Sequence, residues 1–205
     1  MITIIDYGTG NLNSIKNMLK RLGAESVISN KVEDIQQADK LILPGVGAFD
    51  YGMLQLQKSG LVPVLNEKVL QYRTPILGIC LGVQLFTQSS EEGKEIGLGW
   101  IAGRTIAFDI SKLSENQKIP HMGWKDVKFS NNSKLFDSMF ADPRFYFVHS
   151  YHLKIDNPDE IAVQANYGYN FAAGVEKGNI LGVQFHPEKS HKYGMKLLEN
   201  FVKYY

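Results

Sequence analysis

The segment "TPILGICLGVQLF" (residues 74–86) passes from an apolar run straight into a helical pattern, with Cys80 at the change. We predict a buried strand over residues 75–79 and a helix from 81 to 86. Gly78 and Gly82 stand two residues before and two residues after Cys80. A strand that turns directly into a helix is the repeating step of an α/β fold.

The rest of the first half alternates in the same way. Short apolar runs predict strands over residues 2–5, 26–29 and 40–45. Apolar residues spaced three and four apart predict helices over residues 12–22, 49–57 and 61–72. Strands and helices that alternate at this spacing indicate a parallel sheet with helices on its faces.

The second half is richer in strands, and glycine and asparagine turns separate several of them, as in hairpins. The expected strands cover residues 104–109, 125–129, 144–150, 161–167, 170–176 and 179–185. Residues 190–205 end the chain as a helix whose inward-facing side chains are Met195, Leu198, Phe201 and Val202. We expect residues 1–205 to form one mixed α/β domain.

Composition excludes several classes of protein. The 205 residues are 44% hydrophobic, and their net charge of +1 gives no signature of nucleic-acid or membrane-surface binding. The single cysteine cannot form an internal disulfide, and the N-terminal apolar run reaches Asp6 too soon for a signal peptide. No apolar stretch approaches a membrane span, and the sequon at Asn131 carries little weight without a secretory context. We therefore expect a cytoplasmic protein.

Cys80 has two interpretations. A nucleophile on a sharp strand-to-helix turn needs small neighbours, which Gly78 and Gly82 supply. The positive end of the helix dipole favours a thiolate there, and the backbone N–H of Leu81 can stabilise an oxyanion. Free cysteine is also among the most buried residue types, so the turn alone equally allows a core cysteine.

Two other segments offer partners for this thiol. In "QFHPEKS" (184–190), an extended chain puts His186 and Glu188 on one face, as a base and the carboxylate that orients it. A surface histidine beside a charged turn is the alternative. In "LPGVGAF" (43–49), Gly45 and Gly47 can expose backbone N–H groups to an oxyanion, although a plain turn has the same pattern. The combination of these two segments with Cys80 is a more specific sign of nucleophilic catalysis than any one of them.

Other motifs fail. "GTGNLN" (8–13) has Asn13 where a dinucleotide-binding loop needs its third glycine. His149 and His152 lie three apart in "HSYH" (149–152), which we expect to be extended, so they should face opposite sides, and nothing completes a metal set. We expect no metal and no cofactor.

Six segments together resemble the class I, triad-type glutamine amidotransferases from end to end. They are "DYGTGNLNS", "LPGVGAF", "LGICLGVQLF", "IPHMGW", "FVHSY" and "GVQFHPEKS". Within that family, "DYGTGN" and "PHMGW" are similar to the glutaminase subunits that serve histidine biosynthesis. The resemblance implies a flavodoxin-like, open, mostly parallel sheet with helices on both faces, plus antiparallel strands in the second half.

The resemblance also implies hydrolysis of glutamine to glutamate and ammonia through a thioester. Cys80 is then the nucleophile, His186 the base and acid, and Glu188 its orienter. The oxyanion-hole amides fall on Val46 and Leu81. The positions that match the family's contacts to substrate glutamine are Gly47, Gln84, Glu92, Ser150 and Tyr151.

A partner is implied as well, because a chain of this size leaves no room for an acceptor-binding synthase domain. The family pairs such a subunit with a (β/α)₈ cyclase in a heterodimer, where the ammonia helps to form imidazole glycerol phosphate. The matching interface positions are Asn11, Trp124, Tyr146 and Lys189.

One departure bears on the acceptor of the ammonia. Lys125 follows "PHMGW", where the family usually has asparagine. Related subunits supply ammonia for amidation of surface or flagellar sugars, so that acceptor is an alternative. An elbow-cysteine hydrolase of another kind, or a flavodoxin-like module without catalysis, are further alternatives that the Cys, His and Glu pattern disfavours.

Overall fold

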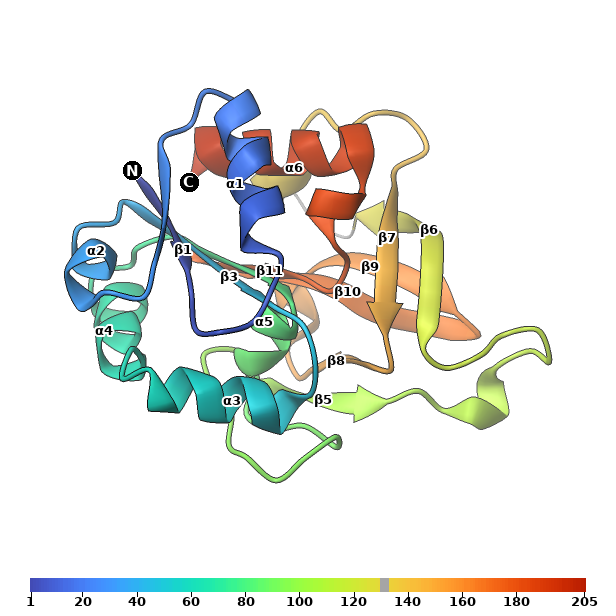
Figure 1. Ribbon diagram of the computed structural model, residues 1–205. Helices are drawn as coiled ribbons and strands as arrows, with labels where there is room; N and C mark the ends of the chain where they lie inside the picture. The colour runs from blue at the N-terminus through green and yellow to red at the C-terminus, as the bar shows by residue number, and fades with distance from the viewer. Residues whose placement is uncertain (130–132) are drawn as a thin grey trace.

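The computed structural model describes residues 1–129 and 133–205, and Figure 1 shows them as a central sheet between two layers of helices. The sequon at Asn131 lies outside the described residues. The first half contains β1 (Ile2–Ile5), α1 (Leu12–Arg21), β2 (Ser26–Ser29), α2 (Val32–Gln36), β3 (Lys40–Gly45), α3 (Phe49–Lys58), α4 (Val62–Asn66), β4 (Ile76–Cys80) and α5 (Leu81–Leu85). The second half contains β5 (Gly103–Ala107), β6 (His121–Phe129), β7 (Arg144–His149), β8 (Tyr151–Ile155), β9 (Ile161–Tyr167), β10 (Tyr169–Lys177), β11 (Ile180–Val183) and α6 (His191–Tyr204).

The sheet has a parallel half and an antiparallel half. Its parallel strands follow the order β2-β1-β3-β4-β11, which is the 2-1-3-4-5 order of flavodoxin-like sheets. Beyond β11 the sheet continues antiparallel through β10, β9, β6 and β7, while β5 and β8 pair beside β10. This arrangement confirms the predicted fold class.

The register brings the predicted site segments to one edge of the sheet. Gly45 at the end of β3 lies opposite Cys80 at the end of β4. Gly182 of β11 lies opposite Gly78 of β4. The loops that follow β1, β3, β4 and β11 therefore meet at the carboxyl ends of parallel strands, where open α/β sheets bind their ligands.

Apolar side chains pack on both faces of the sheet. Figure 1 shows α1 and α6 on one face and α2 to α5 on the other. Alternate residues of β3 point to opposite faces, so Ile42 joins the first core cluster while Leu41 and Leu43 join the second. Among the described residues no helix is long and apolar enough to cross a membrane, and the longest, α6, has 14 residues.

The structure differs from the predicted elements in a few places. The helix expected over 61–72 is divided into α4 and a π-helical turn over Glu67–Gln71. Two short elements, α2 and β8, lie outside the prediction. The expectation that His149 and His152 face opposite sides of one strand is wrong, because β7 ends at His149 and a separate strand, β8, begins at Tyr151. Both rings instead pack on Phe108, with centroid distances of 5.2 and 4.7 Å.

Candidate active site

Cys80 occupies a strained turn between β4 and α5. Its φ of 55° and ψ of −112° lie in a region that residues other than glycine rarely adopt. A Cβ on Gly82 would lie 1.8 Å from the carbonyl oxygen of Leu43, and one on Gly78 would lie 2.6 Å from the ring of Phe86. The packing around the turn therefore requires both glycines, as predicted from their spacing.

His186 and Glu188 form a buried pair beside this turn. Nδ1 of His186 lies 2.8 Å from Oε1 of Glu188, and the two side chains are 2% and 3% exposed. Residues Pro187–Lys189 form a 3₁₀ turn rather than the extended segment expected, so the pair meets across a turn. The backbone of His186 is fixed by its N–H bond to the carbonyl of Tyr146 at 2.9 Å.

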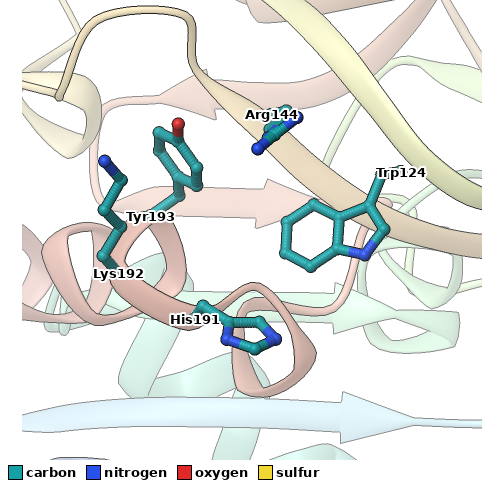
Figure 2. A pocket seen from close by; sticks show the side chains of 5 residues that line it. All are labelled: Trp124, Arg144, His191, Lys192 and Tyr193. Atoms are coloured by element: carbon teal, nitrogen blue, oxygen red, sulfur yellow. The ribbon is translucent and has the colours of Figure 1, made fainter.

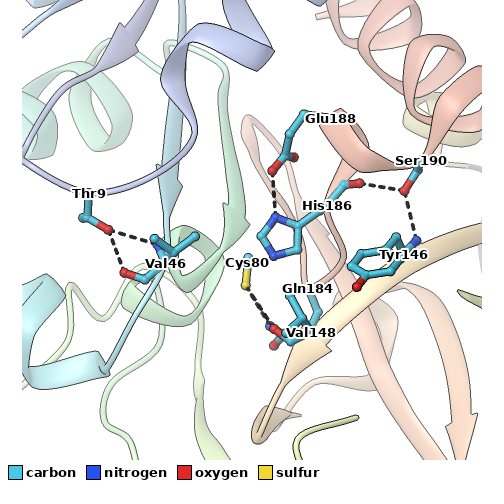
Figure 3. Close-up of polar contacts among 9 residues, drawn as sticks. All are labelled: Thr9, Val46, Cys80, Tyr146, Val148, Gln184, His186, Glu188 and Ser190. Atoms are coloured by element: carbon cyan, nitrogen blue, oxygen red, sulfur yellow. Dashed lines mark hydrogen bonds and ion pairs between the residues drawn. The ribbon is translucent and has the colours of Figure 1, made fainter. Parts of the chain in front are cut away.

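The charge of His186 is set by its neighbours. Burial alone would lower its pKa, but hydrogen bonding and electrostatic attraction from the Cys80 sulfur and the Glu188 carboxylate outweigh burial and raise the pKa to about 10. Figure 3 shows the ring of His186 between Glu188 and Cys80. Its Nε2 is buried, with no hydrogen-bond partner among the described residues. This nitrogen therefore remains available to exchange a proton with the thiol.

The sulfur of Cys80 has contacts that the sequence analysis missed. Nε2 of Gln184 donates to Sγ at 3.8 Å, and Sγ lies 4.0 Å from the carbonyl oxygen of Val148 (Figure 3). Tyr7 is buried close by, and burial together with the neighbouring Cys80 raises its pKa. Position 184 lies two residues before His186 in "QFHPEKS", so strand alternation offered a signal for it.

Cys80 opens into a cavity of about 260 Å³. All the predicted oxyanion and substrate positions line this cavity, together with Cys80 and His186. Glu188 is buried, bonded to the imidazole of His186. The lining residues are Val46, Gly47, Cys80, Leu81, Gln84, Glu92, Val148, His149, Ser150, Tyr151, His186 and Lys189.

The backbone of Val46 is bonded on the side away from Cys80. Its N–H donates to Oγ1 of Thr9 at 3.0 Å, and the same hydroxyl donates to its carbonyl at 2.7 Å. Figure 3 shows Val46 between Thr9 and Cys80, with both bonds on the Thr9 side. An oxyanion contact from this N–H, which stays a prediction, requires the bond to Thr9 to break.

Polar groups of the cavity wall are held by the framework behind them. One carboxylate oxygen of Glu92 accepts the N–H of Phe49 at 2.8 Å, at the first turn of α3. Nδ1 of His149 lies 2.7 Å from the carbonyl oxygen of Tyr151, and its Nε2 lies 2.9 Å from Nδ1 of His121. Burial lowers the pKa of His149 to about 3, so this ring is neutral and donates to Tyr151.

Three of the four predicted interface residues lie together. Nζ of Lys189 lies 5.7 Å from the ring of Tyr146, whose ring is 6.3 Å from that of Trp124. Trp124 borders a second, larger hollow of about 700 Å³ (Figure 2), lined by Trp124, Arg144, His191, Lys192 and Tyr193. Asn11 is exposed at the start of α1, in the loop that also carries Thr9.

The described residues contain no group of three or more His, Cys, Asp or Glu side chains placed to hold a metal ion. The rings of two neighbouring histidines, His121 and His149, are hydrogen-bonded to each other. Burial, with Lys125 nearby, lowers the pKa of His121 to about 4. These histidines therefore form a neutral, structural pair beside the cavity.

Known proteins are similar to this sequence over nearly its whole length. The family model for class-I glutamine amidotransferases matches residues 3–204. The chain is 55% identical to imidazole glycerol phosphate synthase subunit HisH 2 of Methanococcus maripaludis, over 99% of both chains. It is 51% identical to the Pseudomonas aeruginosa protein of the same name, again over 99% of both. The corresponding subunit HisH of Bdellovibrio bacteriovorus is 46% identical over 98% of both.

Solved structures share the fold. A crystal structure of a glutamine amidotransferase superposes with a TM-score of 0.74 at 18% identity, covering 99% of this chain and 98% of the other. PurLQS from Thermotoga maritima gives a TM-score of 0.71 at 20% identity, covering 99% and 97%.

Proposed function

Since the chain belongs to the class-I glutamine amidotransferase family, we propose that it hydrolyses glutamine and supplies the ammonia for imidazole glycerol phosphate synthesis in histidine biosynthesis. The relatives at 46–55% identity are named as subunits of that synthase. Sugar amidation, another kind of hydrolase and a non-catalytic module have no support among these relatives.

One observation carries the chemistry: a strained cysteine shares a cavity with a buried histidine whose far nitrogen is held by a carboxylate at 2.8 Å. Cys80 gives its proton to Nε2 of His186, and the sulfur attacks the amide carbon of glutamine. His186 then returns the proton to the departing nitrogen, which leaves as ammonia. Water hydrolyses the resulting thioester to glutamate and restores the thiol.

The negative oxygen that forms at each attack needs donors. The N–H of Leu81, first residue of α5, supplies one. The N–H of Val46 supplies the second once it leaves Thr9, so the isolated chain has an incomplete oxyanion hole and low activity. Residues that hold the substrate glutamine are Gly47, Gln84, Glu92, Ser150 and Tyr151.

The ammonia passes to a synthase partner. Free ammonia becomes ammonium at neutral pH, which is not nucleophilic, so direct transfer between subunits preserves it. We assign the partner as a (β/α)₈ cyclase subunit in a cytoplasmic heterodimer. The surface contacts that support this assignment join exposed Trp124 and Lys189 through half-buried Tyr146, with exposed Asn11 on a separate loop.

The test is glutamate release from glutamine, measured for the chain alone and with the cyclase subunit. We expect low turnover alone and stimulation of at least about tenfold by the partner, within the usual range of coupling between sites. Cys80→Ala should abolish turnover in both. Glutamine turnover by Cys80→Ala equal to that of the wild type would overturn the mechanism.

A second arm identifies the acceptor. The wild-type chain is assayed with the cyclase and with a sugar-amidating enzyme, each with its own acceptor. Formation of imidazole glycerol phosphate from glutamine supports the proposal. Amidation of the sugar alone, with the cyclase inert, would contradict the histidine assignment while leaving the glutaminase chemistry intact.

A further inference from the structure

Gln184 lies against the nucleophile from behind the cavity wall. It is fully buried, and its Nε2 donates to Sγ of Cys80 at 3.8 Å. A Cβ on Gly182, two residues earlier, would meet the side chain of Val83 in α5. Alternate residues along β11 and just after it therefore point toward β4 and α5, where the thiol lies. The ring of His186, two residues after Gln184, lies on another side of Cys80 (Figure 3).

A chain of hydrogen bonds fixes which end of the Gln184 amide faces the sulfur. Nε2 of Gln84 lies 3.2 Å from the backbone carbonyl of Tyr151, which can only accept, so this end of Gln84 is the donor. The same Nε2 lies 3.0 Å from Oε1 of Gln184. Oxygen of Gln184 therefore faces Gln84, and its NH₂ group faces Cys80.

This orientation matters once the thiol ionises. The proton passes to Nε2 of His186, and the electron pair stays on Sγ. The anionic sulfur then lies 4.0 Å from the carbonyl oxygen of Val148, whose partial charge has the same sign. An N–H from Gln184 supplies the opposite partial charge, and hydrogen bonds to a charged acceptor are about twice as strong as neutral ones.

We propose that Gln184 is a further catalytic residue, whose side-chain N–H holds the sulfur of Cys80 and stabilises it as the anion. Gln84 fixes the amide in the orientation that does this, in addition to contacting glutamine. The inference rests on the glutaminase function proposed above. It connects the substrate-binding wall to the nucleophile through two buried amides.

The direct test is the rate at which iodoacetamide alkylates Cys80 in Gln184→Met. The chain has one cysteine, so the label reports this thiol alone, and Cys80→Ala gives the blank. Methionine has a similar length and no N–H donor. We expect alkylation at neutral pH to slow about tenfold, the loss typical of one hydrogen bond to a charged group. Alkylation at the wild-type rate would overturn the proposal.

Asn200→Leu is the matched control. Asn200 is also a fully buried amide, and its Nδ2 donates to the carbonyls of Leu135 and Asp137, away from the thiol. Both variants lose stability, but only Gln184→Met should lose alkylation rate. In the complex with the cyclase, the kcat of Gln184→Met for glutamine should fall about tenfold while its KM changes less than about twofold. An equal loss of alkylation rate in Asn200→Leu would assign the effect to packing.

Gln84→Met tests the orienting role and leaves the Gln184 side chain in place. The side chain of Gln84 bonds to Gln184 and Tyr151 and not to Cys80. Without it the Gln184 amide is free to turn, so we expect alkylation of Cys80 to slow about threefold. In the double variant the rate should equal that of Gln184→Met alone. Additive losses in the double variant would refute the orienting chain. A wild-type rate in Gln84→Met would refute it even if Gln184→Met does not fold.

These measurements separate the two proposals. Alkylation needs neither glutamine nor a partner, so it tests the role of Gln184 even if the chain releases no glutamate. Absence of glutamate release from the wild-type complex would contradict the proposed function alone. Normal glutaminase activity with wild-type alkylation in Gln184→Met would contradict this inference alone.

Discussion

His186 keeps its proton well above neutral pH. Cys80 and Glu188 outweigh the effect of burial and raise its pKa to about 10, against an ordinary value of 6.5. Because the folded value is the higher one, its contribution to folding is complete below about pH 6.5 and is lost as pH rises through about 10. At physiological pH His186 therefore holds, as the imidazolium, the proton that Cys80 gives up, and can deliver it to the departing nitrogen.

Replacing the Glu188 carboxylate should reverse part of the rise in the pKa of His186. Glu188→Gln keeps an acceptor oxygen for Nδ1 but removes the negative charge, so the pKa of His186 should fall toward neutrality. A histidine titration followed by NMR checks the shift. We also expect kcat for glutamine to drop at least about tenfold, since the carboxylate no longer stabilises the imidazolium. An unchanged titration midpoint would show that Glu188 does not set the charge of His186.

Among the elements, burial decided what the sequence could predict. The strands β1, β3 and β4 are short, mostly apolar runs, and α6 repeats its apolar residues at helical spacing, so both kinds of element were recognisable in the sequence. The helix α2 has five residues and one buried side chain, Ile35, which is too short for a period. The break between β7 and β8 falls at one residue, Ser150, inside a run that reads as extended throughout.

The residues of the site also fall into those that the sequence predicts and those that it does not. Cys80, His186 and Glu188 are recognisable because short motifs fix their spacing along the chain. The contacts of Thr9 with Val46 and of Gln184 with Cys80 join residues 37 and 104 positions apart. Such contacts depend on the order and register of the strands, which the sequence pattern alone leaves open.

The loop between β1 and α1 holds the segment after β3 through one hydroxyl. Thr9→Val preserves the shape of the side chain and removes both bonds to Val46. One hydrogen bond is worth about 1 kcal/mol net, so freeing the Val46 N–H should raise glutamate release by the isolated chain about fivefold. Thr9→Ser keeps the hydroxyl and should behave like the wild type. If Thr9→Val is no more active without the partner than Thr9→Ser, the bond does not limit activity.

At the scale of the whole molecule, the two halves of the sheet have different tasks. The parallel half ends in the loops that carry Cys80, His186 and the Val46 segment. The antiparallel half contributes the opposite cavity wall, residues 148–151, and the aromatic surface around Trp124. Lys189 lines the cavity and lies over Tyr146, so that surface is continuous with the active site. We therefore expect the proposed partner to bind on this surface, beside the cavity.

Trp124 should be the main anchor of that partner. Its side chain is 41% exposed, and Arg144 lies 6.0 Å from its ring. Truncating an anchoring tryptophan at the centre of an interface costs 2 kcal/mol or more, so Trp124→Ala should weaken binding of the cyclase about thirtyfold, measured by calorimetry. Alkylation of Cys80 in the isolated chain should be unchanged, because Trp124 borders the second hollow. Ile110→Ala, which truncates an apolar side chain that is 76% exposed, is the matched control and should bind normally. Equal affinities for Trp124→Ala and Ile110→Ala would place the interface elsewhere on the molecule.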